Sequence, residues 1–284
     1  MKRGESTLAL DSFVAKWVAA EPELGIALTF LPPSQRASEA AFACLSRELA
    51  HACFAIREGD VALAKLGWWN EELLRSQKGE PRHPLTQTLD SHLDLSRVPV
   101  ASWQAVIAAA VQQRDRDPAS DFTGQIAGFE RLFRPLADIE TMLLGRRDAV
   151  ATARVSALAH ALREAAGVAR VLENGHVALP LDALARHRLR RDQLAVDNPE
   201  RRRAAAEQLQ AIATAFDELA RRDTRVALVT QASLLADHTR ARKASRADDP
   251  IAELASQLTK LSMATTWNIW RAACRQRTVN SSHE

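Results

Sequence analysis

The sequence contains no tyrosine, and only 5% of its 284 residues are aromatic. Glycine, with 10 residues, and proline, with 11, are also scarce. Strands favour β-branched and aromatic side chains, and the turns between short strands need glycine or proline, so these shortages argue against a β-sandwich or β-barrel. Alanine and leucine, both strong helix formers, fill 88 positions (53 Ala and 35 Leu). We therefore predict an all-α protein, large enough for one hydrophobic core or two smaller ones.

Cysteine and long apolar segments are nearly absent as well. The three cysteines (Cys44, Cys53 and Cys274) form no CxxC pair and are odd in number, which is typical of buried thiols in a reducing cytoplasm. Acidic Glu5 and Asp11 interrupt the first residues before the apolar stretch of a signal peptide can form. No apolar stretch reaches the roughly 18 residues of a membrane-spanning helix. We expect a cytoplasmic protein with at most peripheral contact with the inner membrane.

An excess of charge of one sign is missing too, since 38 basic residues face 35 acidic ones. The stretch richest in arginine, residues 185–225, holds ten arginines but also seven acidic residues. An ion-paired, solvated helix face explains this pattern better than a track for phosphates. We therefore expect no nucleic-acid partner.

Apolar periodicity and proline positions predict a series of amphipathic helices with short connections. No internal repeat and no long linker divides the series, so we predict one domain over residues 1–284, with a frayed tail at 278–284. The predicted helices cover residues 33–57, 60–79, 84–93, 99–111, 122–144 and 149–173, and two more begin at 199 and 250.

Three local strings carry a resemblance to a known family. They are LPPSQRASEAAFACLSREL (residues 31–49), KLGWWNEELLRSQKGEPRHPLTQTL (65–89) and GHVALPLDALARHRL (175–189). In this order and at these separations they resemble the squalene/phytoene synthase family over residues 25–195, with a weaker similarity around Trp267 and Trp270. The resemblance implies a single-domain helical bundle of the isoprenoid synthase type.

The same resemblance also implies a reaction and the positions of the residues that would bind its metal ions. Active members of the family join two prenyl diphosphates with Mg²⁺ held by two aspartate-rich motifs. Carboxylates are needed because hard oxygen ligands must hold the ions that neutralise the diphosphate. Here the first motif falls on residues 50–54, which contain no carboxylate, and the second begins at Asn174 and is cut short by Gly175. His176 and Ala178 replace the family's arginine and tyrosine in the following turn.

These departures define the predicted function. We predict a divergent member that has lost Mg²⁺-dependent condensation, needs no cofactor, and acts as an isoprenoid-binding, lipid-binding or assembly protein, with a possible protein partner. No catalytic residue and no metal ligand is assigned, and the chain is more readily understood as a non-enzyme. The candidates for lining a cavity or binding a ligand are Ala50, His51, Phe54, Trp68, Trp69, Gly167, Arg170 and His176.

Two alternatives stay open from the sequence. The first is an active prenyl transferase with displaced Mg²⁺ ligands, for which Asp115, Asp117 and Asp121 form the only compact acidic cluster. A solvated helix end explains that cluster more simply, just as core packing explains the adjacent Trp68 and Trp69. The second alternative is a helical interaction module whose cavity is filled by side chains.

Overall fold

The computed structural model describes residues 2–145, 147–222 and 224–281. Within these residues it contains fourteen α-helices, two short 3-10 helices and no strand, which confirms the predicted all-α class. The α-helices are α1 (Lys2–Ala20), α2 (Pro22–Phe30), α3 (Pro33–Phe54), α4 (Gly59–Ser76), α5 (Pro84–His92), α6 (Val100–Arg114), α7 (Phe122–Leu144), α8 (Ala149–Ala166), α9 (Val168–Glu173), α10 (Leu181–Arg186), α11 (Pro199–Arg221), α12 (Leu228–Ala244), α13 (Pro250–Gln257) and α14 (Met263–Ser281). The 3-10 helices are η1 (Leu95–Arg97) and η2 (Arg191–Ala195).

Side-chain caps explain why several helices begin where the sequence predicts. Asn198 and Asp249 each accept a hydrogen bond from a backbone N–H in the first turn of α11 and α13, and proline follows at the first helical position. Both features satisfy or remove backbone donors that the helix leaves unpaired. Helix α7 has the predicted bounds and continues through Pro135.

Three boundaries differ from the prediction. The expected helix over 149–173 is divided at Gly167, whose backbone leaves the helical region and separates α8 from α9. Helix α4 begins at Gly59, so Asp60 lies in its first turn instead of capping it. Helix α4 also ends at Ser76, before the predicted end at residue 79. The fraying predicted for residues 278–284 stays a prediction: α14 is described to Ser281, and residues 282–284 lie outside the described part.

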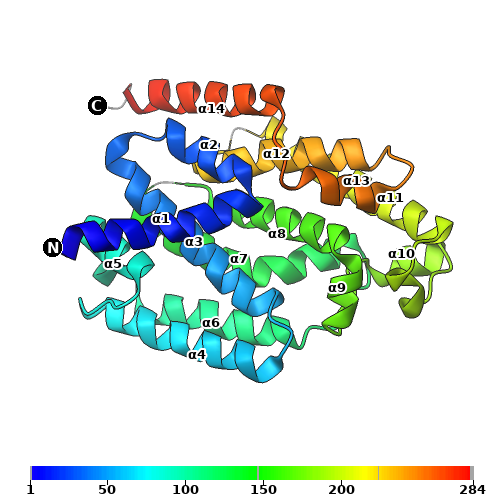
Figure 1. Cartoon of the computed structure of the whole chain (residues 1–284), viewed down its shortest axis with the longest axis horizontal. Coiled ribbons are helices and arrows are strands. Elements are labelled where there is room, and N and C mark those ends of the chain that lie inside the picture. Colours follow the sequence, from blue (N-terminus) through cyan, green and yellow to red (C-terminus); the bar gives the residue numbers. More distant parts are fainter. Residues whose placement is uncertain (1, 146, 223, 282–284) are drawn as a thin grey trace.

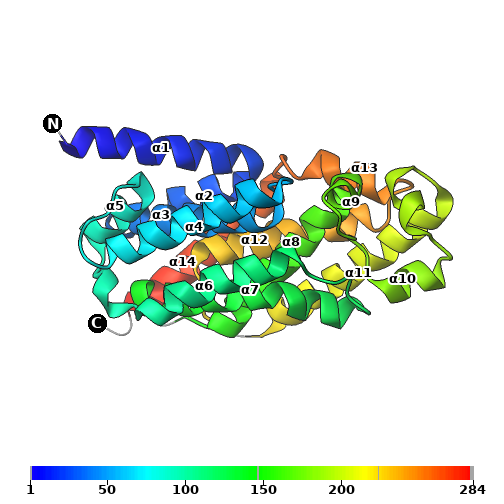
Figure 2. The same cartoon turned by 90° about the horizontal axis from the view of Figure 1, so that it is seen from below.

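The helices run mostly along the long axis of the molecule, with the start of α1 and the end of α14 near one end and α10 at the other (Figures 1 and 2). Helix α7 packs along α8, and α11 packs along α12. Helix α14 lies against α2 and α12 on the outside of the bundle. In the described residues, no helix combines the length and apolar character that crossing a bilayer requires.

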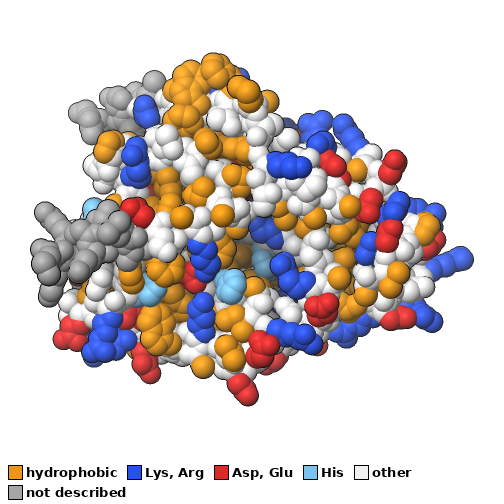
Figure 3. Space-filling view, viewed as in Figure 1, with side chains coloured by type: hydrophobic (Ala, Val, Ile, Leu, Met, Phe, Trp, Pro, Cys, Tyr) orange, Lys and Arg blue, Asp and Glu red, His pale blue; other side chains and the backbone are white. Residues whose placement is uncertain are grey.

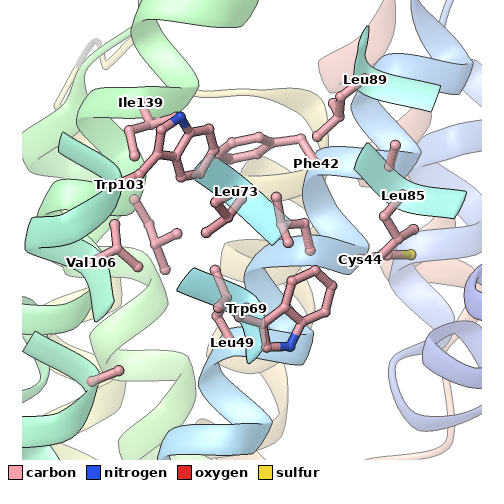
Figure 4. Packing of buried hydrophobic residues seen from close by; sticks show 14 of the residues in the cluster. Phe42, Cys44, Leu49, Trp69, Leu73, Leu85, Leu89, Trp103, Val106 and Ile139 are labelled. Carbon is pink, nitrogen blue, oxygen red and sulfur yellow. The ribbon is translucent and has the colours of Figure 1, made fainter. Parts of the chain in front are cut away.

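The hydrophobic core is divided among several clusters that surround the central helices. The largest joins α3 to α7 and contains Trp69 and Trp103, both almost fully buried. Figure 4 shows Trp69 beside Leu49 of α3, and Trp103 near Ile139 of α7. A second cluster joins α7, α8, α11 and α12. Because α3, α7, α8 and α12 belong to these clusters, the walls of the space between them are held in place on their outer sides.

Candidate functional site

A cavity of about 620 Å³ lies among α3, α7, α8 and α12. In Figure 3 the face of the molecule is hollowed near its centre, and basic and histidine side chains gather around the hollow. Cavities of roughly 300–1,000 Å³ are the usual size for binding a small molecule. The space between the central helices is therefore large enough for a ligand, and it is not filled by side chains.

Helical periodicity explains which residues line the cavity. The lining positions recur every three or four residues on α3 and α8, so each helix presents one face to the space. Many of these positions hold alanine, whose short side chain leaves the space open. The apolar wall consists mainly of Phe42, Phe54, Phe133, Leu136, Val155 and Leu258, with alanines at 43, 50, 137, 159 and 166.

Five of the eight residues singled out from the sequence lie around this cavity. Ala50, His51 and Phe54 line it from α3, and Gly167 and Arg170 line it from the end of α8 and from α9. An added Cβ at residue 167 would lie 2.9 Å from the Arg170 guanidinium, which would have to shift. The absence of a side chain at Gly167 therefore leaves room for the Arg170 guanidinium in its present position.

The other three residues lie elsewhere. Trp69 is buried in the core and 1% exposed, whereas Trp68 is 42% exposed on the surface of α4. Their rings make an edge-to-face contact, and both approach the ring of His83, which caps α5. His176 lines a second, more polar hollow of about 430 Å³. These three side chains do not line the central cavity.

Glu21 and two arginines form an ion-paired group at one side of the cavity. The Arg47 guanidinium donates to the Glu21 carboxylate at 2.6 and 2.9 Å, and Arg163 lies 3.5 Å from its other oxygen. Burial would raise the pKa of Glu21, but Arg47 and Arg163 outweigh it and lower the pKa to about 2. All three side chains line the cavity, and Arg163 also pairs with the buried carboxylates of Glu23 and Asp237.

A deeper group of charges continues this network behind the cavity wall. Arg163 donates to Asp237 at 2.8 Å, and Arg240 donates to Asp237 at 2.7 Å and to Glu23 at 2.8 and 2.9 Å. Asp237 and Glu23 are fully buried. Arg240 also donates to the backbone carbonyl of Leu258, so the network holds the end of α13 against the cavity.

A second ion-paired group lies where α3 meets α7. Glu39 and Glu140 both line the cavity, and Arg147 bonds to both carboxylates, with 2.6 Å between its Nη1 and Glu140 Oε1. Burial raises the pKa of Glu140, while the charge of Arg147 acts in the opposite direction. A guanidinium that bridges two carboxylates supplies the hydrogen bonds that buried carboxylates require.

His160 lies among aromatic rings at another part of the wall. Its ring is 3.9 Å from the ring of Phe54 and 4.7 Å from that of Phe129, between centroids. Its Nε2 lies 3.2 Å from Glu164, which also accepts from Arg116 at 2.5 Å. Burial lowers the pKa of His160 even though Glu164 favours the charged form. Burial likewise lowers the pKa of His51. Burial therefore favours the neutral form of both imidazoles.

The residues of the cavity do not fit the Mg²⁺ ions implied by the family resemblance. Mg²⁺ needs carboxylate or other oxygen ligands that are free to turn towards it. The three carboxylates that line the cavity, Glu21, Glu39 and Glu140, are all bonded to arginine. Across residues 2–145, 147–222 and 224–281, no three His, Cys, Asp or Glu side chains are grouped so that they could hold a metal.

The acidic cluster considered as a displaced metal site is spread over a loop. Asp115 and Asp117 line the second hollow together with His176 and Arg116. Asp121 instead caps α7, because its Oδ1 accepts from the backbone N–H of Gly124 at 2.8 Å. The cap gives this carboxylate a structural role.

Sequence reasoning missed the charged half of the cavity. Glu39 and Arg47 could have been found, because they precede Ala50 and Phe54 by helical spacing on α3. His160 likewise lies seven residues before Gly167 on α8. Glu21 and Arg163 carry no local signal, since their pairing joins segments more than 140 residues apart.

Comparison with solved structures identifies the architecture. The chain superposes on a crystal structure of a dehydrosqualene synthase in complex with ligand with a TM-score of 0.67 and 12% sequence identity, covering 97% of this chain and 99% of the other. It has the fold of a dehydrosqualene synthase. It is also similar to squalene synthase HpnC from Alicyclobacillus acidocaldarius, with a TM-score of 0.55 and 16% identity over 96% of this chain and 95% of that one. No family model matches the sequence, and no curated protein matches it. The isoprenoid synthase bundle expected from the sequence is therefore confirmed as a fold.

Proposed function

We propose that the chain is a squalene/phytoene synthase-like protein that binds an apolar, uncharged isoprenoid or similar lipid and does not condense prenyl diphosphates with Mg²⁺. The fold neighbours include a squalene synthase and a dehydrosqualene synthase, which supports an isoprenoid as the ligand class. The cavity is lined by phenylalanine, leucine and alanine, which suits a hydrocarbon chain.

One observation carries the proposal: every carboxylate that lines the cavity is paired with an arginine of this chain. Stabilisation of the leaving diphosphate is an electrostatic effect, and such effects are usually the largest in catalysis. A ligand with several negative charges would have to compete with Glu21 for Arg47 and Arg163. An uncharged ligand leaves the ion pairs of the wall intact, so it enters without that cost.

A lipid-extraction experiment tests the binding. The purified protein is examined by native mass spectrometry, and the bound material is then extracted and its mass determined. We expect a neutral lipid, bound one per chain, in the wild type. Ala159→Phe places a ring in the cavity and should abolish binding. Ala108→Phe, on the exposed surface of α6, is the matched control and should retain the lipid.

A second experiment tests the lack of condensation. Farnesyl or geranylgeranyl diphosphate is incubated with the protein and Mg²⁺, and the organic extract is analysed for squalene and phytoene. We expect neither product. Either product would overturn the proposal and support the alternative of an active prenyl transferase. An assembly role would add a protein partner to the same ligand-binding chain.

A further inference from the structure

Helix α14 exposes a stripe of large apolar side chains. Its inner face, with Ile269, Ala272 and Ala273 buried, packs on the bundle. On the outside, Met263 is 89% exposed, Trp267 57% and Trp270 39%. Spacings of four and three residues place these three side chains on one face of the helix, and the two indole rings lie 4.5 Å apart. Orange side chains project at the top of Figure 3, where α14 lies in Figure 1.

The segment of the chain that carries this stripe contains basic residues and no acidic ones. No acidic residue occurs between Glu253 and Glu284, whereas this stretch holds Lys260 and the arginines at 271, 275 and 277. Arg271 directly follows Trp270 and is exposed. A helix that presents tryptophan beside basic residues matches the boundary between anionic headgroups and acyl chains, where indole rings are favoured. We propose that α14 docks the protein on an anionic membrane surface, with Met263, Trp267 and Trp270 inserted at the boundary.

The size of the stripe favours a membrane over a second copy of the chain. A fully buried aromatic side chain contributes roughly 150–250 Å². Two partly exposed tryptophans and one methionine therefore fall well short of the roughly 800 Å² that each partner contributes to a standard interface. A positively charged face would also repel an identical face. Binding to a bilayer needs no matching partner surface, and each inserted side chain adds to the binding free energy independently of the others.

Vesicle flotation tests the docking. The full chain is floated with vesicles of phosphatidylcholine alone and with vesicles that also contain phosphatidylglycerol. We expect binding to the mixed vesicles that weakens as salt is added, because exposed charges are screened. Arg271→Gln should lower the partition coefficient roughly fivefold, since one basic residue near the surface is worth about 1 kcal/mol.

The decisive variant is Trp267→Ser with Trp270→Ser, which should float at least ten times less efficiently by loss of the two indoles. Val61→Ser with Leu63→Ser removes two exposed apolar side chains of α4 and is the matched control, expected to float as the wild type does. Circular dichroism and thermal melting check that both variants fold, and sedimentation velocity reports their oligomeric state. Equal flotation of the tryptophan variant and the wild type would overturn the proposal. A dimer that the tryptophan variant dissociates, without vesicle binding by the wild type, would also overturn it.

Discussion

Replacement of Arg240 by methionine is expected to destabilise the fold strongly. The guanidinium is 4% exposed and pairs with Glu23 and Asp237, both fully buried, which Arg163 also contacts from the cavity side. Methionine fills much of the same space but leaves these carboxylates without their main counter-charge. Removing one partner of a buried ion pair costs about 3–5 kcal/mol. For a chain of this size such a loss lowers Tm by roughly 5–8 °C.

The loss of stability in Arg240→Met should become smaller as the pH is lowered. Burial raises the pKa of Glu23 even with Arg240 present, and removal of the arginine raises it further. A carboxyl whose pKa is higher in the folded state binds its proton more readily there, so lowering the pH towards the unfolded pKa favours folding. The difference in unfolding free energy between wild type and Arg240→Met should therefore narrow from pH 7 to pH 5.

Urea denaturation followed by circular dichroism measures both effects. Arg186→Met is the matched control, because Arg186 is paired with Asp182 and Glu207 on the surface and is 51% exposed. The control should have nearly the stability of the wild type. An unfolding free energy for Arg240→Met within about 1 kcal/mol of the wild type at pH 7, or a deficit that widens towards pH 5, would refute the reasoning.

Three further predictions concern single groups. Ionised Glu21 stabilises the fold fully above its ordinary pKa of 4.5, and this stability is lost as the pH falls towards about 2. Glu21→Gln should therefore flatten the plot of Tm against pH between pH 4.5 and about 2. Burial raises the pKa of the Cys53 thiol to about 12, so iodoacetamide at pH 8 should modify it only after unfolding; peptide mapping that finds it modified in the native protein would contradict this. Asp121→Ala should lower the unfolding free energy by about 1 kcal/mol through loss of the α7 cap. The same loss is expected with and without Mg²⁺, and a loss seen only with Mg²⁺ would indicate a metal ligand.

The sequence predicted the helices whose signals are local. Asp121, Asn198 and Asp249 precede helix starts and do cap them. Ala50 and Phe54 were singled out because the family resemblance places its first aspartate-rich motif on residues 50–54, and both side chains line the cavity. The adjacent Trp68 and Trp69 are conspicuous in the sequence, but the sequence does not show which of them is buried. In the structure Trp69 lies in the core and Trp68 on the surface of α4.

The pairing of charges across the cavity could not be read from the sequence. Arg163 meets Glu21 and Asp237 only because the fold brings α8 beside α12 and beside the residue that precedes α2. Each residue alone is typical of a solvated helix face. The break at Gly167 was missed for a related reason, since glycine inside a helix is tolerated at a cost of about 1 kcal/mol and carries no signal for an interruption.

The pairing of each cavity carboxylate with an arginine also restricts how the protein can evolve. Gaining a metal site would require new carboxylates at positions such as 50 and 54, together with removal of arginines that now neutralise their surroundings. A substitution that leaves one buried charge unpaired costs about 3–5 kcal/mol, a large part of the roughly 5–15 kcal/mol that holds a domain folded. Single steps towards a metal site at these positions therefore pass through poorly folded proteins. Changes in the apolar wall leave no buried charge unpaired, so the shape of the cavity can change far more easily than its charged groups can.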